Sequence, residues 1–321
     1  MSAPVFAVGL PRSGSTLLSR VLNESPDILS VNDLYYLQAV LERGLPEGPL
    51  DQETAGQLLD MMLDLIVIRG STNSAFIGQF TFTPAQSAAL REEVLGIARA
   101  EGLDWAGLMD AALTRVAASA GKTRWADKTP QNFLHMDLLR RTFPDARFLF
   151  LLRSPHATLA SFKFASGSGH DPRRYHPVTY ALYWRTAART LDAERGKADV
   201  LPLRFEDLTG DTEAVCERMG AFLGTVIPAP DLGRVGANSS FRGGRKEVSP
   251  TEAWIVDRIC GERMRAEGYE PSGERPRLAD LPLLLRLTCT FTVFQARRLF
   301  FSRNGRKRII AMARRTLGLD R

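Results

Sequence analysis

Cysteine is scarce in this chain, and its three cysteines, Cys216, Cys260 and Cys289, are too far apart to form a CxxC pair. An odd number of distant cysteines argues against a disulfide framework and against a zinc site, and it is typical of a reducing compartment. The four histidines are scattered without the spacing of metal ligands, so we expect no metal site.

A secretion signal is also missing from the first residues, which lack both a basic start and a long apolar run. Hydrophobic residues make up 44% of the chain and charged residues 24%, which is ordinary for a soluble globular protein. We therefore expect a cytoplasmic protein.

A basic surplus is missing from most of the chain, although the net charge is +6. Residues 281–321 hold ten Lys and Arg against one acid, Asp320, so the whole excess lies in this C-terminal part. The body therefore gives no reason to expect a nucleic-acid partner.

Short apolar runs alternate with helical patterns along the body of the chain. Strands are expected over 5–8, around Trp125, over 147–152 and over 200–204, and helices over 16–23, 51–68, 84–99, 104–119, 177–195 and from Glu206 onward. A further helix is expected after Ser154, with Pro155 in its first position. This alternation predicts a helix-rich, three-layer α/β fold with a central parallel sheet.

The segment from Gly9 to Thr16, Gly-Leu-Pro-Arg-Ser-Gly-Ser-Thr, joins the first strand to the first helix with the spacing of a nucleotide phosphate loop. Backbone N–H groups of such a loop, with the helix dipole, bind anions. The lysine that reaches the β- and γ-phosphates is missing, because Ser15 stands in its place, and Arg12 is the substitute cation. A plain glycine turn between strand and helix is the alternative.

Pro-Arg-Ser-Gly-Ser-Thr, residues 11–16, resembles the 5′-phosphosulfate loop of sulfotransferases that use 3′-phosphoadenosine 5′-phosphosulfate (PAPS). The motif layout is most similar to that of tyrosylprotein-type and related bacterial enzymes. The resemblance implies a phosphate-loop-type fold and in-line transfer of a sulfuryl group from PAPS to an acceptor hydroxyl, without a metal. It assigns donor binding to Arg12, Ser13, Gly14, Ser15 and Thr16, and it makes Arg12 a catalytic candidate.

A second anion site is expected where the strand 147–152 ends in Arg153. Ser161 follows eight residues later, a little over two helical turns, so it can face the same side as the helix start. Ligands of α/β sheets bind at such strand ends. The pair is similar to the 3′-phosphate element of the family, whereas a solvated Arg and a helix-surface Ser are the alternative.

Two further segments resemble parts of the family near the nucleotide. Leu203–Leu208 is similar to a segment beside the adenine, with Phe205 in place of a Tyr, so the packing remains and a hydroxyl contact is lost. Residues 239–246 fall where the family closes basic residues over the nucleotide, which assigns Arg242, Arg245 and Lys246 to the donor. A solvated loop is the competing interpretation of 239–246.

The resemblance also supplies the remaining catalytic candidates. Lys128, in Trp-Ala-Asp-Lys-Thr-Pro, is similar to an element of the tyrosylprotein-type and related enzymes, and we expect it to be a cation near the leaving phosphate oxygen. A surface lysine is the alternative. Asp33 falls where the tyrosylprotein-type enzymes carry a catalytic Glu, and we predict that it is the general base. The alternative is that Asn32 and Asp33 cap the next helix. Pro130 stands where small-molecule sulfotransferases carry a His, and we expect His135 to be structural.

The resemblance covers about residues 5–270, so we predict a sulfotransferase domain over 1–280 and a basic, apolar helical extension over 281–321. Arginines at 286, 297 and 298 interrupt the apolar run before it reaches the roughly 20 residues needed to span a bilayer. Residues 281–318 then either contact the inner face of an anionic membrane or an acidic partner such as a carrier protein, or pack on the body with solvated charges.

The acceptor stays open, because acceptor pockets vary on a shared fold. It is a small molecule, a glycan, a lipid or a carrier-bound substrate. Two rival functions also stay open: a phosphate-loop kinase with an altered loop, and a non-catalytic, membrane-associated nucleotide-binding scaffold. The kinase would need a carboxylate for Mg²⁺ after an apolar strand, whereas the strand 147–152 ends in Arg153.

Overall fold

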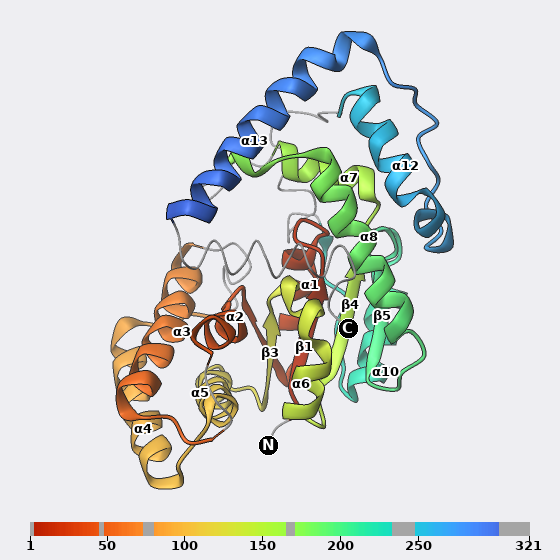
Figure 1. Cartoon of the computed structure of the whole chain (residues 1–321). Helices are drawn as coiled ribbons and strands as arrows, with labels where there is room; N and C mark the ends of the chain where they lie inside the picture. Colours follow the sequence, from red (N-terminus) through yellow and green to blue (C-terminus); the bar gives the residue numbers. More distant parts are fainter. Residues whose placement is uncertain (1–2, 45–47, 73–79, 165–170, 233–247, 302–321) are drawn as a thin grey trace. The chain divides into compact units, whose positions relative to one another are not determined.

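The computed structural model describes residues 3–44, 48–72, 80–164, 171–232 and 248–301 (Figure 1). Contacts divide the chain into two compact units, each assembled from segments that are distant in sequence. The sheet unit comprises Met1–Gly9, Gly14–Leu151 and Arg195–Ala237, and the helical unit comprises Leu10–Ser13, Leu152–Glu194 and Asn238–Arg321. The domain boundary expected at residue 280 stays a prediction.

The sheet unit is built on five strands in the order β2-β3-β1-β4-β5. Their bounds are β1 Val5–Gly9, β2 Ile28–Asn32, β3 Arg124–Lys128, β4 Arg147–Leu152 and β5 Val200–Arg204. The pairings of β1 with β3, β1 with β4 and β2 with β3 are parallel. Nearly all residues of these three pairs are buried, as expected for a parallel sheet covered on both faces. The predicted helix-rich α/β fold is confirmed.

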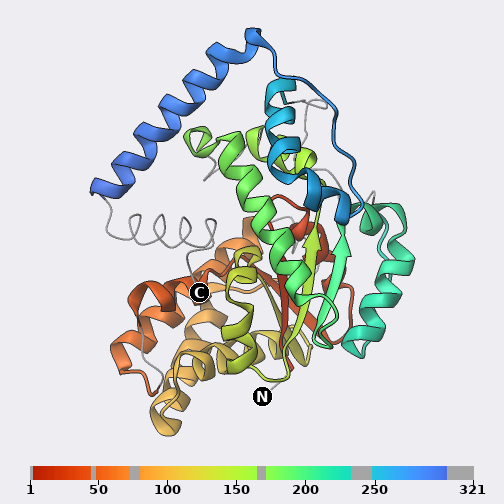
Figure 2. The same ribbon diagram turned by 45° about the vertical axis from the view of Figure 1, so that its right-hand side comes forward.

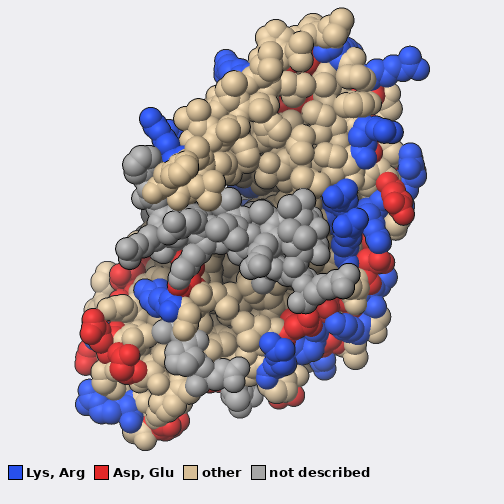
Figure 3. All heavy atoms as spheres, in the orientation of Figure 1, with Lys and Arg blue, Asp and Glu red and all other residues tan. Residues whose placement is uncertain are grey.

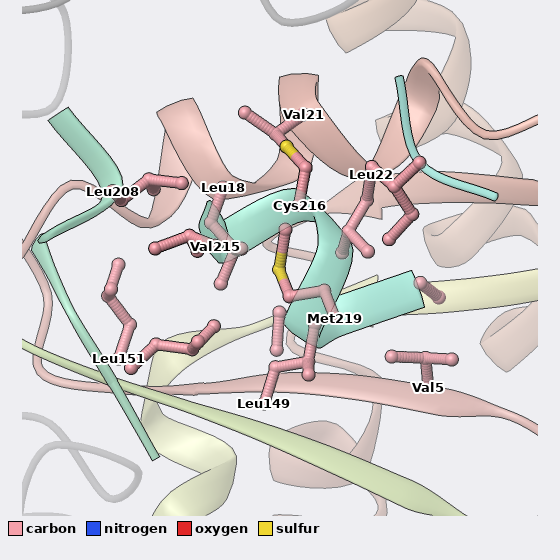
Figure 4. Packing of buried hydrophobic residues seen from close by; sticks show 14 of the residues in the cluster. Val5, Leu18, Val21, Leu22, Leu149, Leu151, Leu208, Val215, Cys216 and Met219 are labelled. Atoms are coloured by element: carbon pink, nitrogen blue, oxygen red, sulfur yellow. The ribbon is translucent and has the colours of Figure 1, made fainter. Parts of the chain in front are cut away.

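Aliphatic side chains pack on one face of the sheet, beneath the three helices α1 (Ser15–Asn23), α9 (Phe205–Gly210) and α10 (Thr212–Leu223). Figure 4 shows this packing, with Leu18 and Val21 of α1 against Val215 and Met219 of α10. Every second strand residue points into the cluster, as the two-residue period of a strand requires. Helix α1, which follows the predicted donor loop, therefore lies on this face of the sheet.

Aromatic side chains fill the opposite face. The ring of Phe6 in β1 lies 5.6 Å from those of Trp125 and Phe148 and 5.7 Å from that of Phe143, measured between centroids. The segments η1 (Pro130–His135) and α6 (Met136–Thr142) follow β3 on this side. Figure 2 shows α10 in teal on one side of the strands and α6 in yellow-green on the other. The sheet is thus the middle of three layers.

Four further helices complete the sheet unit: α2 (Tyr36–Arg43), α3 (Gln52–Thr72), α4 (Pro84–Glu101) and α5 (Trp105–Ser119). The last three confirm the helical patterns predicted over 51–68, 84–99 and 104–119. Thr83 and Gln86 form a reciprocal capping box at the start of α4. Strand β2 and helix α2 were not predicted, because the five residues of β2 form no clear alternating pattern.

Helices make up the second unit: α7 (Pro155–Lys163), α8 (Pro177–Glu194), α12 (Pro250–Ala266) and α13 (Leu281–Phe301), with the short turns η2 (Pro172–Arg174) and η4 (Leu278–Asp280). Glu252 of α12 has no exposed surface and accepts hydrogen bonds from Lys163 Nζ (2.5 Å) and Tyr175 Oη (2.7 Å). A buried carboxylate needs such partners, so these contacts join α7, η2 and α12.

Helix α13 continues through Arg286 without a break. The segment Leu278–Arg297 is long and apolar enough, by length and composition alone, to cross a membrane, and none of it is buried in the protein. The expectation that arginines keep the apolar run too short to span a bilayer is therefore wrong as a statement about length, because the segment meets this criterion although it contains Arg286 and Arg297.

Candidate active site

Two glycines of the predicted loop are required by the backbone that surrounds them. Gly9 has a φ of 137°, and a Cβ at this position would lie 2.2 Å from the carbonyl oxygen of Leu151 on the adjacent strand. Gly14 has a φ of 95°, and a Cβ there would lie 2.1 Å from Cδ2 of Phe205. Any side chain at either position would collide with its neighbour, so the loop keeps two bare backbone positions.

Helix α1 begins directly after Gly14, whose carbonyl accepts hydrogen bonds from the N–H groups of Leu17 (2.9 Å) and Leu18 (3.2 Å). Ser15 and Thr16 therefore form the first turn, where backbone N–H groups have no acceptor within the helix. The helix dipole adds partial positive charge at this end. No acidic residue lies in this first turn, so the end of α1 suits an anion.

Arg12 and Ser13 belong to the helical unit. Ser13 is buried, and its N–H (3.2 Å) and Oγ (2.6 Å) both donate to the carbonyl oxygen of Leu10, which closes a tight turn. Within the turn, Arg12 has a φ of 73°, a left-handed conformation that is uncommon outside glycine. Burial raises the pKa of Tyr180 well above its ordinary value, and the nearby charge of Arg12 opposes this rise.

The second predicted anion element also lies in the helical unit. Arg153 follows β4, and its carbonyl oxygen accepts a hydrogen bond from Trp184 Nε1 at 2.9 Å. Pro155 begins α7 as predicted, whereas Ser154 occupies the cap position without a side-chain capping bond. Ser161 lies two turns into α7 and is 2% exposed. The end of β4 and the start of α7 thus lie where the sequence predicted them. The phosphate-binding role of Arg153 and Ser161 stays a prediction.

Lys128 and Asp33 are in direct contact, although 95 residues separate them in the sequence. Lys128 Nζ donates to Asp33 Oδ2 at 2.8 Å, and the backbone N–H of Asp33 donates to the carbonyl oxygen of Lys128 at 2.7 Å. The Lys128 side chain is 2% exposed and that of Asp33 is 21% exposed. The structure therefore brings together the candidate cation and the candidate base at the carboxyl ends of β3 and β2.

The backbone at Asp33 excludes the capping interpretation. Asn32 is the last residue of β2, and the residue that precedes α2 is Tyr35, which makes no side-chain capping bond. Asp33 has a φ of 49°, and only Arg12, Asp33 and Tyr35 among the non-glycine residues described have a positive φ. Such conformations collect at functional sites, where the surroundings hold them.

Residues 4–228 match the sequence model of the sulfotransferase family. The chain belongs to the sulfotransferase family. It is 25% identical over 237 residues to nodulation protein NoeE of Sinorhizobium fredii (strain NBRC 101917 / NGR234), a match that covers 68% of this chain and 49% of that protein. The chain thus spans about half the length of this curated relative.

The solved structures that match this chain include two sulfotransferase domains. One, from the Synechococcus PCC 7002 olefin synthase, is 22% identical with a TM-score of 0.45, and the match covers 90% of this chain and 94% of that one. The other, from the curacin biosynthetic pathway, is 15% identical with a TM-score of 0.48, covering 84% of this chain and 99% of that one.

Sequence reasoning missed Asp127, the residue before Lys128. Its fully buried carboxylate accepts hydrogen bonds from Thr129 Oγ1 (2.7 Å) and Asn132 Nδ2 (2.9 Å). Burial raises the pKa of Asp127 to about 7, and the bond from Thr129 opposes the rise. Asp127 therefore fixes the turn from β3 into η1 and with it the strand end that carries Lys128. The Asp-Lys-Thr-Pro motif already places this carboxylate beside Lys128 and Thr129, but only its lysine was predicted to be functional.

Asn32 was also missed as a candidate in its own right. It is 1% exposed, and neither Nδ2 nor Oδ1 of its side chain has a hydrogen-bond partner among the residues that the structure describes. Asn32 lies beside Lys128 in the parallel register. Buried amides without partners are rare in folded proteins, and a bound ligand is one explanation for such a group.

The face on which Asn32 lies follows from its neighbour two residues earlier. Ser30 Oγ is 2.8 Å from Ser19 Oγ, so Ser30 and, by the two-residue period, Asn32 point toward α1. The helix runs opposite to β2, and two residues of strand match about four residues of helix. Asn32 therefore lies on the face of β2 that α1 covers, nearer than Ser30 to the start of this helix.

Phe205 is the first residue of α9, is buried, and packs on Gly14 itself. The predicted packing role thus applies to the loop glycine, while its contact with adenine stays a prediction. Arg242, Arg245 and Lys246 lie outside the described residues. In the part of the chain that the structure describes, no three His, Cys, Asp or Glu side chains are grouped to hold a metal ion.

Proposed function

We propose that this sulfotransferase moves the sulfuryl group of PAPS to a hydroxyl of its acceptor by in-line displacement. The observation that carries the proposal is the direct contact of Lys128 and Asp33 at the carboxyl edge of the sheet, where β3 and β2 end. A cation and a carboxylate are the two groups that this reaction needs beside the donor loop.

The residues of the loop fit a phosphosulfate. Gly9 and Gly14 leave backbone positions that a Cβ would fill, and the first turn of α1 presents N–H groups without acidic side chains. The place of the lysine that serves a γ-phosphate is taken by Ser15, which suits a donor without that group. Bound PAPS supplies the activated sulfuryl group, and the family resemblance assigns its 3′-phosphate to Arg153 and Ser161.

In the proposed reaction Asp33 accepts the proton of the acceptor hydroxyl. A bond forms between that oxygen and sulfur, while the bond from sulfur to the phosphate oxygen breaks and leaves its electron pair on 3′,5′-adenosine bisphosphate. Lys128 stabilises the charge that develops on this oxygen. The Lys128–Asp33 pair keeps both charges compensated while they are buried, and it must open during the reaction.

Asn32 fits this scheme as a polar contact for the bound groups. Its amide has one donor and one acceptor side, both buried and both without a partner within the described segments of the chain. The donor side suits an oxygen of the phosphosulfate at the first turn of α1. We propose this role for Asn32 on the strength of its burial and its strand neighbour Lys128.

We place the reaction in the cytoplasm. Cys216, Cys260 and Cys289 are free thiols, and Cys289 is exposed. An exposed free thiol fits a reducing compartment. We further propose that the reaction needs no metal, because a sulfuryl group carries one negative charge and less charge needs to be neutralised than in phosphoryl transfer.

Calorimetric titration of the full chain with 3′,5′-adenosine bisphosphate, and separately with ATP and Mg²⁺, tests the donor. We expect binding of the bisphosphate, loss of that binding in Arg153→Ala, and no binding of ATP. The matched control Arg99→Ala removes a surface arginine of α4 and should bind as the unchanged protein does.

Two results would overturn the proposal. ATP binding in place of the bisphosphate would favour the kinase, and no binding of either nucleotide by folded protein would favour the scaffold. Turnover of PAPS in the presence of a chelator then tests the absence of a metal, since loss of activity would contradict it.

A further inference from the structure

Helix α13 exposes large apolar side chains to solvent. Leu281 is 52% exposed, Leu285 59%, Val293 57% and Phe300 83%. No residue of the candidate span that contains most of this helix is buried in the protein. An exposed group of this kind marks an interaction surface more often than a scattered single residue does.

These four side chains lie on one side of the helix. At 3.6 residues per turn, positions 281, 285, 293 and 300 fall within about one third of the circumference. We call this set the apolar stripe. Its length from Leu281 to Phe300 covers nearly the whole of α13, so it forms a line rather than a spot.

The other side of α13 is already held by the helical unit. His176 Nε2 lies 3.2 Å from Thr288 Oγ1, and the ring of His176 lies 5.3 Å from that of Phe291. The guanidinium groups of Arg173 and Arg174 lie 5.3 Å and 5.8 Å from the ring centre of Phe294. At 3.6 residues per turn, Phe291 and Phe294 lie opposite the stripe, whereas Thr288 lies at its edge beside Leu281. The stripe therefore faces away from the ring contacts that dock the helix.

Positive charge borders the stripe. Arg286 and Arg297 are exposed and eleven residues apart, which is close to three turns, so both lie along the same edge of the stripe. The surface over α13 in Figure 3 is largely uncharged, and basic side chains lie along its margin. The sequence beyond the helix, residues 302–321, adds seven Lys and Arg against Asp320 alone.

We propose that the apolar stripe of α13 docks on an anionic phospholipid bilayer. The helix lies in the plane of the surface, with Leu281, Leu285, Val293 and Phe300 inserted among the acyl chains and the arginines beside lipid phosphates. An apolar side with flanking basic residues is the pattern of interfacial helices. This proposal stands independently of the reaction at the sheet.

Two other occupants fit the stripe less well. A helix that crosses the bilayer would have to leave its contacts with residues 173–176 and would carry Arg286 into the hydrocarbon. A second copy of the chain paired about a two-fold axis would bring the arginines of both copies into one interface, where like charges repel. A lipid surface satisfies both the apolar stripe and the charge.

Sedimentation of the full chain with vesicles tests the proposal. We expect binding to vesicles of phosphatidylcholine with phosphatidylserine, little binding to phosphatidylcholine alone, and release by high salt. Leu285→Ser with Val293→Ser should lower binding at least about tenfold, because two apolar side chains no longer insert. Arg286→Glu with Arg297→Glu should lower it by a similar factor on anionic vesicles only.

Val226→Ser is the matched control, because Val226 is an exposed valine of the sheet unit (69%) far from α13 in the sequence. Its binding should equal that of the unchanged protein, and thermal unfolding of every variant separates lost docking from lost folding. Equal binding to neutral vesicles, or none to anionic ones, would overturn the proposal. Vesicle binding that resists salt and alkali would indicate a helix that spans the membrane. A dimer of the unchanged protein that the serine variant does not form would indicate that a second copy of the chain occupies the stripe.

Discussion

The carboxyl edge of the sheet and helix α13 depart in opposite ways from the rule that a folded chain buries apolar groups and exposes polar ones. At the sheet edge, Lys128 and Asn32 are buried at 1% exposure each, and the Asn32 side chain has no hydrogen-bond partner in the part of the chain that the structure describes. On α13, leucine, valine and phenylalanine side chains stand more than half exposed. Both arrangements cost free energy in the isolated protein.

The two regions await different kinds of partner. Buried polar groups indicate a polar ligand, since a hydrogen bond made inside the protein offsets the loss of water. Exposed apolar groups indicate an apolar surface that removes them from water.

Lys128→Ala should give the largest effect. If Lys128 stabilises the leaving oxygen, its loss lowers the turnover of PAPS by about 10²–10³-fold, as the removal of one electrostatic donor does elsewhere. Lys128→Arg should keep part of the activity. Lys197→Ala removes an exposed lysine of the same unit as a control, and turnover unchanged in both alanine variants would remove Lys128 from the reaction.

Gly14→Ala tests whether the bare loop position matters. The new Cβ would meet the ring of Phe205 and would have to adopt a φ of 95°, so bisphosphate binding should fall about 10- to 100-fold. Adding Phe205→Ala removes the collision but keeps the backbone strain. Recovery of binding in the double variant assigns the loss to Phe205, and no recovery assigns it to φ.

Asn32→Leu separates stability from ligand binding. Removing a buried amide without a partner should leave the melting temperature equal or higher, since an unsatisfied group costs about 1–3 kcal/mol. Bisphosphate or PAPS binding should weaken about tenfold with the loss of one hydrogen bond to a charged group. A lower melting temperature together with full binding would make Asn32 a structural residue and would contradict its role as a contact for the ligand.

Asp127→Asn should change how stability depends on pH. Because the pKa of Asp127 is raised from 3.8 to about 7, the folded protein holds a proton that the unfolded chain releases. The contribution of Asp127 to the free energy of unfolding is therefore full below pH 3.8 and is lost as the pH rises to about 7.

Urea unfolding at several pH values measures this effect. The stability of the unchanged protein relative to Asp127→Asn should fall as the pH rises from about 4 to about 7 and stay level above that. A constant difference over this pH range would contradict the prediction, because it would show that the pKa of Asp127 is the same in the folded and the unfolded protein.

The parts of the fold that follow from local patterns were predictable from the sequence. Strands β1, β4 and β5 are short apolar runs, and the helices α3, α4 and α5 carry long repeating patterns with clear breaks. Strand β2 was not recognised, because Ile28–Asn32 is short and its polar Ser30 and Asn32 lie on a buried face. Their burial depends on α1 covering that face, which is a tertiary property.

The candidate site shows the same division between local and distant information. Gly9, Arg12, Ser13 and Gly14 were identified from one continuous motif, and Lys128 and Asp33 from two separate ones. No local pattern could show that Asp33 meets Lys128, because this contact follows from the pairing of β2 with β3. For the same reason the unpartnered amide of Asn32 and the raised pKa of Asp127 could not be read from residue order.

By itself the sequence determined the family, the donor loop and the basic, apolar character of the C-terminal part, because spacing and composition along the chain are local properties. Only the tertiary structure decided which side of α13 is left exposed, that Phe205 closes on Gly14, and that Lys128 and Asp33 form a pair. These depend on side chains from distant segments meeting in space, and strand order and helix docking, rather than distance along the chain, determine which of them meet.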